Sequence, residues 1–260
     1  MYYNKNIALH QLEEMVTFAI NSKVEYLPNS FQEKQFEALA IFKKRFLLEE
    51  IIDESISFNK KLHWNYENHN LQLTKTAEEL IEVFKLRSDV YASINYQNEF
   101  PDTIEGLNFD IFDKNSAIIY YKNNSKVTGS IRLIFDSNNG LPSEEKLSFN
   151  NFRNEYKMIS EISRNVVFNE GRGLNLEFKY LMCGIYNIFT NNNIDIALSG
   201  IKQEHLKLFK KLGGVNVIKE MNSYGSLDVP FYIISYNPSE ASKFFKKVFL
   251  EDNSIHLESA

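Results

Sequence analysis

Apolar residues recur at helical spacing through the first quarter of the chain. Leu9, Leu12 and Val16 begin one such series, and a second series predicts a helix over residues 32–57, with Pro28 breaking the chain between them. Two helices by themselves make a poor core, because helices owe most of their stability to packing. We therefore expect residues 1–71 to form a helical extension that packs on the main domain or on a second subunit.

A change of pattern begins at Thr76-Ala-Glu-Glu79, which has the form of a capping box at a helix start. Apolar positions at helical spacing continue to about Ile94. Two strand-like runs follow, over residues 117–122 and 127–135, and the sequence Asn123-Asn-Ser-Lys126 between them predicts a hairpin turn. The hydrophobic pattern therefore predicts a helix followed by a β-hairpin.

The remainder of the chain alternates between strands and helices. Strands are predicted over residues 158–168, 194–199, 215–219 and 231–236, and helices over residues 174–190, 203–212 and, beginning at Pro238, up to about 250. This order indicates a mixed α/β (α+β) layer fold over residues 72–260.

Composition narrows the classes of function. The 260 residues carry a net charge of -5 without a basic block, which argues against nucleic acid as a partner. There is no signal-peptide pattern, no apolar run of membrane-spanning length, and a single cysteine, so we expect a cytoplasmic protein. A P-loop, a dinucleotide fingerprint and a zinc-protease motif are all missing from the sequence, and we expect no metal.

Charged residues within apolar elements are the main chemical signal. Such residues are costly to bury singly but tolerable as a network. They are Arg87, Asp110, Asp113, Arg132, Glu161 and Arg164. The network is either structural or the wall of a polar pocket beside a hydrophobic channel.

The motifs that contain these charges carry a resemblance to a known family. They are Leu86-Arg87 with Asp89-Val-Tyr91, then Asp110-x-x-Asp113, then Val127-x-Gly129-x-x-Arg132-Leu133, and then Glu161-Ile-Ser-Arg164. In this order they resemble the acyl-homoserine-lactone synthase (LuxI-type) branch of the GNAT acyltransferases, and still more the FeeM-type N-acyl amino acid synthases. The resemblance implies a GNAT-like, mostly antiparallel central sheet flanked by helices.

The same resemblance implies transfer of an acyl chain from a phosphopantetheine thioester to an amine. The donor would be acyl carrier protein or acyl-coenzyme A, with no permanently bound cofactor. Glu161 is the candidate base. The resemblance also implies a bulge in the strand of Glu161, which would explain the spacing to Arg164 and free backbone amides near Val166 and Val167 for an oxyanion.

Two further groups of residues are assigned through the resemblance. Acceptor contacts and pocket walls would come from Arg87, Tyr91, Asp110, Asp113, Arg132, Ser163 and Arg164. The turn Gly171-Arg172-Gly173-Leu174 loosely matches a pyrophosphate loop at a helix start, and would hold the phosphate of the donor.

The sequence leaves more than one acceptor open. The lactone synthases usually have a tryptophan in the loop after the first helix, where this chain has Asn95-Tyr96, and its only tryptophan is Trp64. This difference disfavours S-adenosylmethionine as acceptor, although a lactone autoinducer synthase stays possible. A peptide lysine also stays possible as acceptor, and so does a non-catalytic protein that binds acyl ligands or a protein partner.

Overall fold

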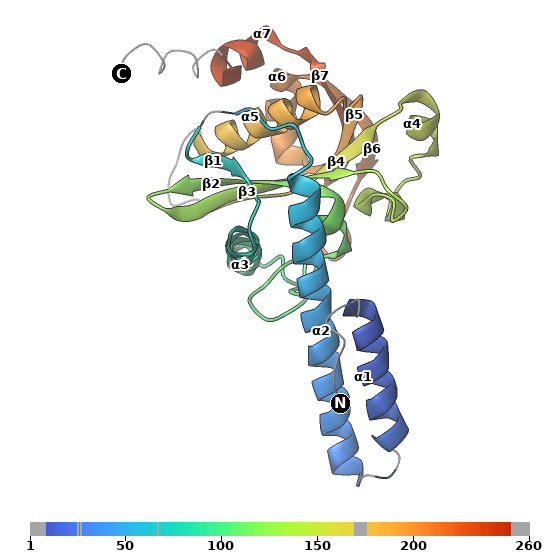
Figure 1. Ribbon diagram of the computed structural model, residues 1–260. Coiled ribbons are helices and arrows are strands. Elements are labelled where there is room, and N and C mark those ends of the chain that lie inside the picture. The colour runs from blue at the N-terminus through green and yellow to red at the C-terminus, as the bar shows by residue number, and fades with distance from the viewer. Residues whose placement is uncertain (1–8, 25, 27, 67, 169–175, 251–260) are drawn as a thin grey trace. The chain divides into compact units, whose positions relative to one another are not determined.

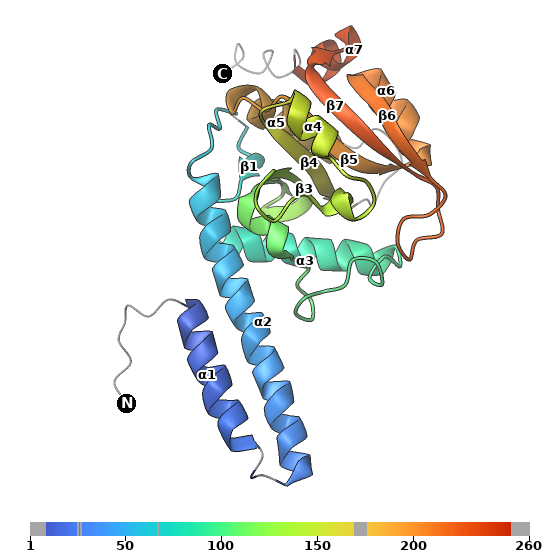
Figure 2. The ribbon, with the colours of Figure 1, turned by 90° about the vertical axis from the view of Figure 1, so that its right-hand side faces the viewer.

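The computed structural model describes residues 9–24, 26, 28–66, 68–168 and 176–250. It divides the chain into two units, residues 1–54 and 55–260. The first unit contains α1 (Leu9–Val24) and most of α2 (Asn29–Asn59), which lie side by side in Figures 1 and 2, with Lys43 Nζ 3.7 Å from Glu13 Oε1. The assignment of residues 1–71 as an extension and 72–260 as the acyltransferase domain stays a prediction.

A seven-stranded sheet forms the centre of the second unit, in the order β1-β2-β3-β4-β5-β7-β6. Its strands are β1 (Leu71–Leu73), β2 (Ser116–Asn123), β3 (Lys126–Phe135), β4 (Ile159–Val167), β5 (Ile196–Lys202), β6 (Gly213–Met221) and β7 (Phe231–Ala241). Every neighbouring pair is antiparallel except β4 and β5, which are parallel. The expected mixed, mostly antiparallel sheet is therefore confirmed.

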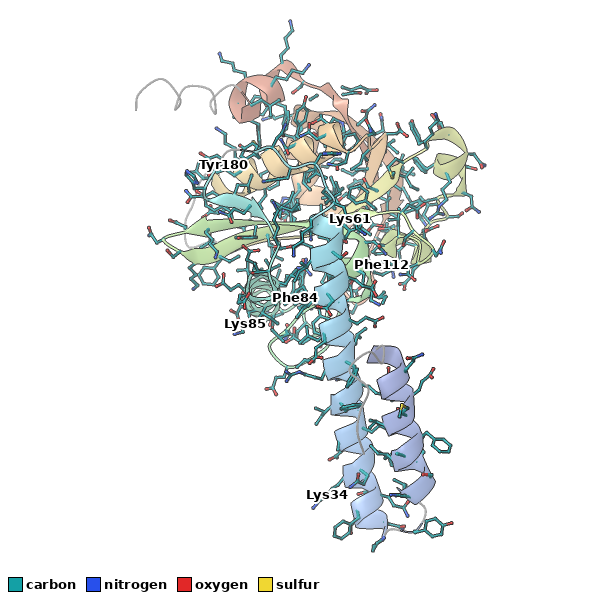
Figure 3. The ribbon with its side chains drawn as sticks, in the orientation of Figure 1. Lys34, Lys61, Phe84, Lys85, Phe112 and Tyr180 are labelled. Carbon is teal, nitrogen blue, oxygen red and sulfur yellow. The ribbon has the colours of Figure 1, made fainter. Side chains whose placement is uncertain are left out.

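Helices cover both faces of the sheet, with α5 (Leu176–Asn191) on one face and α3 (Ala77–Ser93) on the other (Figure 1). On the α5 face, Tyr180 stacks on Tyr121 of β2 with 5.3 Å between ring centroids (Figure 3). Gly184 lets α5 approach the sheet closely, because a Cβ there would lie 3.0 Å from the Ile119 side chain. The α5 face is thus filled by a tightly packed apolar core.

The remaining elements are short. They are η1 (Ile111–Asn115), η2 (Pro142–Glu145), α4 (Asn150–Glu155), η3 (Gln203–His205), α6 (Leu206–Leu212), α7 (Lys243–Phe245) and the π-helical turn η4 (Lys246–Leu250). The strand β1 was missed by the sequence pattern, because three residues are too few to show a period. It is paired with β2 through Leu71 and Tyr121.

Local signals were correct at several helix and strand ends. Thr76 Oγ1 accepts from the Glu79 amide, and Glu79 accepts from the Thr76 amide, so the capping box is confirmed. Asn124 and Ser125 both have positive φ in the predicted hairpin turn between β2 and β3. These turns and caps depend on neighbouring residues only, which is why the sequence predicts them.

The helix predicted from Pro238 is wrong. β7 continues to Ala241, which pairs with Gly213, while Tyr236 pairs with Val215. The extra residues between Tyr236 and Ala241 form an irregular segment that accommodates Pro238, a residue that cannot donate to a regular ladder. Only the short α7 and η4 follow.

Candidate active site

The two halves of the sheet separate between β4 and β5. These strands pair only from Ile159 with Ile196 to Ile162 with Ser199. Beyond this point β4 continues along β3 as far as Val167, and β5 continues along β7 to Lys202. The two strand ends therefore diverge and leave an opening in the sheet.

β4 carries a bulge at this point. Ser163 pairs with Arg132 and Val166 pairs with Ser130, so Arg164 and Asn165 lie opposite Ile131 alone. Arg164 has a φ of 51°, a left-handed conformation that is unfavourable for a residue with a Cβ. The predicted bulge is confirmed, and it changes the alternation of side chains so that Arg164 can reach Asp110.

A cavity of about 340 Å³ lies at the divergence of the strands. Its walls come from the end of α3 and the loop that follows, the bulged end of β4, the end of β5, the start of α6 and the loop between β6 and β7. The lining residues are Val90, Tyr91, Ile94, Tyr96, Phe100, Ile162, Ser163, Arg164, Asn165, Val166, Val167, Ser199, Gly200, Ile201, Lys202, His205, Phe209, Tyr224 and Phe231. Apolar and aromatic side chains predominate, and Arg164, Lys202 and His205 add basic groups.

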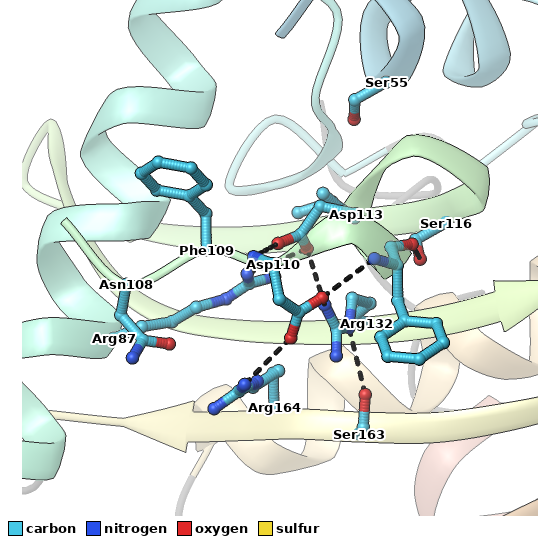
Figure 4. A network of polar contacts seen from close by, with 12 residues as sticks. Ser55, Arg87, Asn108, Phe109, Asp110, Asp113, Ser116, Arg132, Ser163 and Arg164 are labelled. Atoms are coloured by element: carbon cyan, nitrogen blue, oxygen red, sulfur yellow. Dashed lines mark hydrogen bonds and ion pairs between the residues drawn. The ribbon is translucent and has the colours of Figure 1, made fainter. Parts of the chain in front are cut away.

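The predicted charge network forms on the α3 face of the sheet (Figure 4). Asp113 accepts from Arg87 at 2.9 Å and lies 3.0 Å from Arg132, and both arginines and Asp113 are almost completely buried. Asp110 lies 2.6 Å from Arg132 and 2.8 Å from Arg164. The structure thus joins five residues from α3, η1, β3 and β4 into one network.

Backbone geometry positions the two acids of the network. Asp110 caps η1, accepting from the Phe112 amide at 3.0 Å, and the Asp110 amide donates to Asp113 at 2.9 Å. Although burial opposes the ionisation of Asp110, Arg132 and Arg164 outweigh it and hold its pKa well below the usual range. Asp110 is therefore ionised when the arginines are in place.

Arg164 connects this network to the cavity. Its Nη2 donates to Asp110 Oδ2 at 2.8 Å, and its guanidinium lies over the rings of Phe100, at 4.7 Å, and Tyr91, at 5.5 Å. Nη1 is buried and has no hydrogen-bond partner among the described residues. Nε and Nη2 of Arg87 are likewise buried without a partner among the described residues, so the network holds more guanidinium donors than its two acids satisfy.

Glu161 lies beside the network but does not line the cavity. Its carboxylate accepts from the Ser143 amide at 2.9 Å and from the Ser143 hydroxyl at 2.8 Å. Burial raises the pKa of Glu161 to about 7, against the opposing effect of these hydrogen bonds. The role of Glu161 as base, and that of the amides near Val166 and Val167, stay predictions.

Other predicted site residues are placed as follows. Tyr91 and Ser163 line the cavity, and Ser163 Oγ accepts from Arg132 Nε at 3.0 Å. Gly171, Arg172, Gly173 and Leu174 lie outside the described residues, so their assignment to the donor phosphate stays a prediction.

Phe100, Ser143, His205 and Tyr224 were not predicted as site residues from the sequence. Ser143 bonds Glu161, and the other three line the cavity. Phe100, Ser143 and Tyr224 come from loops and short turns without a recognisable motif, and only the folded chain brings them to β4. Phe100, His205 and Tyr224 are far from β4 along the chain, so a local pattern of residues cannot show that they lie beside it.

Comparison with known families identifies the chain. The family model for the N-acyl amino acid synthase FeeM matches residues 82–237, which is more than half of the sequence. The chain belongs to the FeeM family of N-acyl amino acid synthases. It is an N-acyltransferase of the GNAT type, as the motifs around Arg87, Asp110, Arg132 and Glu161 predicted. No curated protein matches the sequence.

Solved structures agree with this fold. The structure of FeeM, an N-acyl amino acid synthase from uncultured soil microbes, is similar with a TM-score of 0.50 and 18% identity, covering 65% of this chain and 95% of that one. The acyl-homoserine lactone synthase BjaI, a coenzyme A-dependent enzyme solved with S-adenosylmethionine and isopentyl-coenzyme A, is similar with a TM-score of 0.52 and 16% identity, covering 68% and 83% of the two chains. Within the described residues, no helix combines the length and hydropathy needed to cross a membrane.

Proposed function

We propose that this FeeM-family protein transfers a fatty acyl group from a phosphopantetheine thioester to the α-amine of an amino acid. The observation that carries the proposal is the cavity between the diverging strands β4 and β5, with the half-bonded Arg164 in its wall. The reaction forms a C–N bond and breaks the thioester C–S bond. An ammonium acceptor releases one proton overall, and the thiol leaves with another.

The acceptor carboxylate is assigned to Arg164. One side of its guanidinium is bonded to Asp110, while the buried Nη1 has no partner among the described residues. Arginine presents planar donors that match a carboxylate, and charge-assisted bonds of this kind are stronger than neutral ones. Asp110 holds the guanidinium in place, so that binding requires little reorganisation.

The acyl donor is assigned to the free edge of β4. From Ser163 to Val167 this strand is paired with β3 only, so its other edge faces the gap that β5 leaves. The pantetheine arm has two amide groups, and it can lie along such an edge as a short additional strand. This places the thioester near Val166 and Val167. Because the Phe168 amide donates to the Thr128 carbonyl of β3, the Val166 amide also points towards β3, and the Val167 amide, which points to the free edge, is the proposed donor to the oxyanion.

Glu161 is the proposed proton acceptor. A pKa of about 7 matches a general base that acts near neutral pH, because the group is ionised there and still accepts a proton readily. The neighbouring Arg132 favours the ionised carboxylate, and burial opposes it. Deprotonation of the acceptor ammonium to Glu161 would leave both groups neutral within the site.

A basic surface beside the cavity favours acyl carrier protein over free acyl-coenzyme A. η3 contributes His205 and α6 contributes Phe209 to the cavity walls. Lysines at positions 207, 210, 211, 243, 246 and 247 are exposed on α6, α7 and η4. Ser242 at the start of α7 donates to the Leu212 carbonyl, so these elements are adjacent. A local cluster of this kind steers an acidic partner despite the net charge of -5.

The primary test is amide synthesis by the purified protein. Acyl carrier protein thioesters and acyl-coenzyme A are each offered with a panel of amino acids, S-adenosylmethionine and a lysine peptide, and the products are read by mass spectrometry. We expect an N-acyl amino acid, and Glu161→Gln is expected to lower turnover by roughly 10²–10⁴-fold. Formation of an acyl-homoserine lactone would show that S-adenosylmethionine, rather than an amino acid, is the acceptor. Failure to form an amide from any of the donors would refute the proposal.

Charge reversal at the basic surface tests the choice of donor. Lys210→Glu is expected to raise the KM for acyl carrier protein several-fold, with a smaller effect at high salt because exposed charges are screened. The same variant should leave the KM for acyl-pantetheine unchanged. Lys157→Glu is the matched control, since Lys157 is an exposed lysine between α4 and β4. If Lys210→Glu and Lys157→Glu have equal effects, this surface does not recognise the carrier protein.

A further inference from the structure

A second cation, Lys202, lies on the same aromatic patch of the cavity wall as Arg164. Lys202 is the last residue of β5 and lines the cavity, with its Nζ 4.6 Å from the centroid of the Tyr96 ring. The guanidinium of Arg164 lies 4.7 Å from the centroid of the Phe100 ring. These two ring centroids are 6.5 Å apart, and both rings line the cavity. Cations from the two diverging strands are thus held over neighbouring rings of one loop.

The ammonium group of Lys202 has a weak ion pair within the protein. Its Nζ lies 3.6 Å from Glu204 Oε1, and the Glu204 side chain is 66% exposed, so that solvent screens the pair. The Lys202 side chain itself is 29% exposed. A charge that is partly withdrawn from water interacts more strongly with an anionic ligand than a charge on the open surface does.

The cavity wall has basic side chains and, among the described residues, no acidic ones. Glu99 belongs to the loop that carries the two rings, but its carboxylate accepts from the Ser226 amide at 2.6 Å and does not line the cavity. Burial lowers the pKa of His205, so Lys202 and Arg164 are the permanent charges of the wall. The wall is therefore suited to a ligand with two negative groups.

We propose that the acceptor is an acidic amino acid, aspartate or glutamate, whose side-chain carboxylate binds Lys202 while its α-carboxylate binds Arg164. This inference rests on the proposed N-acyltransferase function and names the substrate class of the same site. The reaction still forms one C–N bond and breaks the thioester C–S bond. Its product is an N-acyl dicarboxylic acid, and neither carboxylate of the acceptor changes in the reaction.

The donor phosphate is the other anion that Lys202 could bind, and the position of Lys202 favours the acceptor. The ring under Lys202 and the ring under Arg164 belong to the same loop after α3, so the two cations face one region of the cavity. Arg164 in this region is assigned to the acceptor, whereas the donor is assigned to the free edge of β4. An anion held by Lys202 therefore lies beside the α-carboxylate of the acceptor.

The test compares acids with their uncharged amides of nearly the same shape. Wild-type protein is offered glutamate against glutamine and aspartate against asparagine, with one acyl donor held at saturation, and kcat/KM is measured by mass spectrometry. We expect the acid of at least one pair to be preferred by roughly 10-fold. This factor is at the low end for a hydrogen bond to a charged group, because Lys202 is partly exposed.

Substitution of Lys202 assigns the preference to one side chain. Lys202→Met keeps an apolar stem over Tyr96 and removes the charge, and it should lower the ratio of acid to amide to about one. Lys202→Glu should invert the ratio. Each ratio compares two acceptors on the same protein, so a loss of folded enzyme cancels.

Lys122→Met is the matched control. Lys122 on β2 lies 5.4 Å from the centroid of the Tyr120 ring, pairs with Glu82 at 3.2 Å and has a side chain that is 30% exposed. It is not among the residues that line the cavity. This variant should keep the wild-type ratio of acid to amide.

The outcomes separate this inference from the proposed function. If wild-type protein forms amides but uses glutamine and asparagine as well as the two acids, the acceptor class is wrong and the acyltransferase function stands. If Lys202→Met keeps the wild-type ratio, or raises the KM of the donor without changing that ratio, Lys202 does not bind the acceptor. If wild-type protein forms no amide from any donor, the proposed function fails and this inference fails with it.

Discussion

Recognition of the acceptor carboxylate by Arg164 can be tested by one conservative substitution. Arg164→Lys keeps the positive charge beside Asp110 but replaces the planar, forked guanidinium with a single ammonium group. The lysine can pair with Asp110, as Nη2 does now at 2.8 Å, but it cannot place a second fixed donor where Nη1 lies. The substitution therefore removes the carboxylate contact more than it disturbs the network.

The size of the effect follows from the type of bond that is lost. A hydrogen bond to a charged group contributes about 1.5–3 kcal/mol, and each 1.4 kcal/mol changes an equilibrium tenfold. We expect the KM for the amino acid to rise roughly 10- to 150-fold. The KM for the acyl donor should stay within a factor of about two, because the donor is assigned to the edge of β4 and carries no carboxylate at this position.

The assay compares each amino acid with its carboxamide, in which the carboxylate is neutral. Product is measured by mass spectrometry for wild type and variant with both acceptors, which gives a double cycle. The wild type should prefer the acid by roughly the same 10- to 150-fold factor, and Arg164→Lys should abolish that preference. Arg45→Lys is the control, since Arg45 is an exposed arginine paired with Glu49 on α2.

Two results would refute this reasoning. A wild-type enzyme that uses the carboxamide as well as the acid does not read the carboxylate at all. A variant that loses activity with both acceptors to the same extent has lost the arrangement of the site, in which case Arg164 serves the network rather than the acceptor.

Two predictions concern stability, measured by urea unfolding. Asp113→Asn should lower the free energy of unfolding by about 3–5 kcal/mol, because Asp113 is the ion-pair partner of the buried Arg87; Arg87→Met should cost less, since Asp113 keeps Arg132 at 3.0 Å. The reverse order would contradict this network. Glu161, with its folded pKa raised from 4.5 to about 7, adds stability below about pH 4.5 that is lost as the pH rises to about 7. Relative to Glu161→Gln, the free energy of unfolding of the wild type should therefore fall by up to about 3 kcal/mol between these pH values. If the two proteins show parallel curves of unfolding free energy against pH, the pKa of Glu161 is not raised.

The predicted site divides into parts of different origin. The members of the charge network could be named from the sequence, because a charge inside an apolar run needs a partner wherever the chain places it. The pairing of each acid with its arginine could not be predicted from the sequence. Asp110 meets both Arg132 and Arg164, and the contact with Arg164 depends on a bulge whose left-handed residue is an arginine rather than a glycine.

The sequence by itself determined the elements that depend on neighbouring residues: the capping box at Thr76, the hairpin turn at Asn124 and the order of strands and helices that characterises the family. Tertiary structure decided the cavity, the exclusion of Glu161 from its wall, the hydrogen bonds of Ser143 to Glu161 and the place of Tyr224 in the cavity wall. These features arise where β4 and β5 stop pairing, and the gap is filled by loops distant along the chain. Their positions depend on packing against the whole sheet, which no local pattern of residues records.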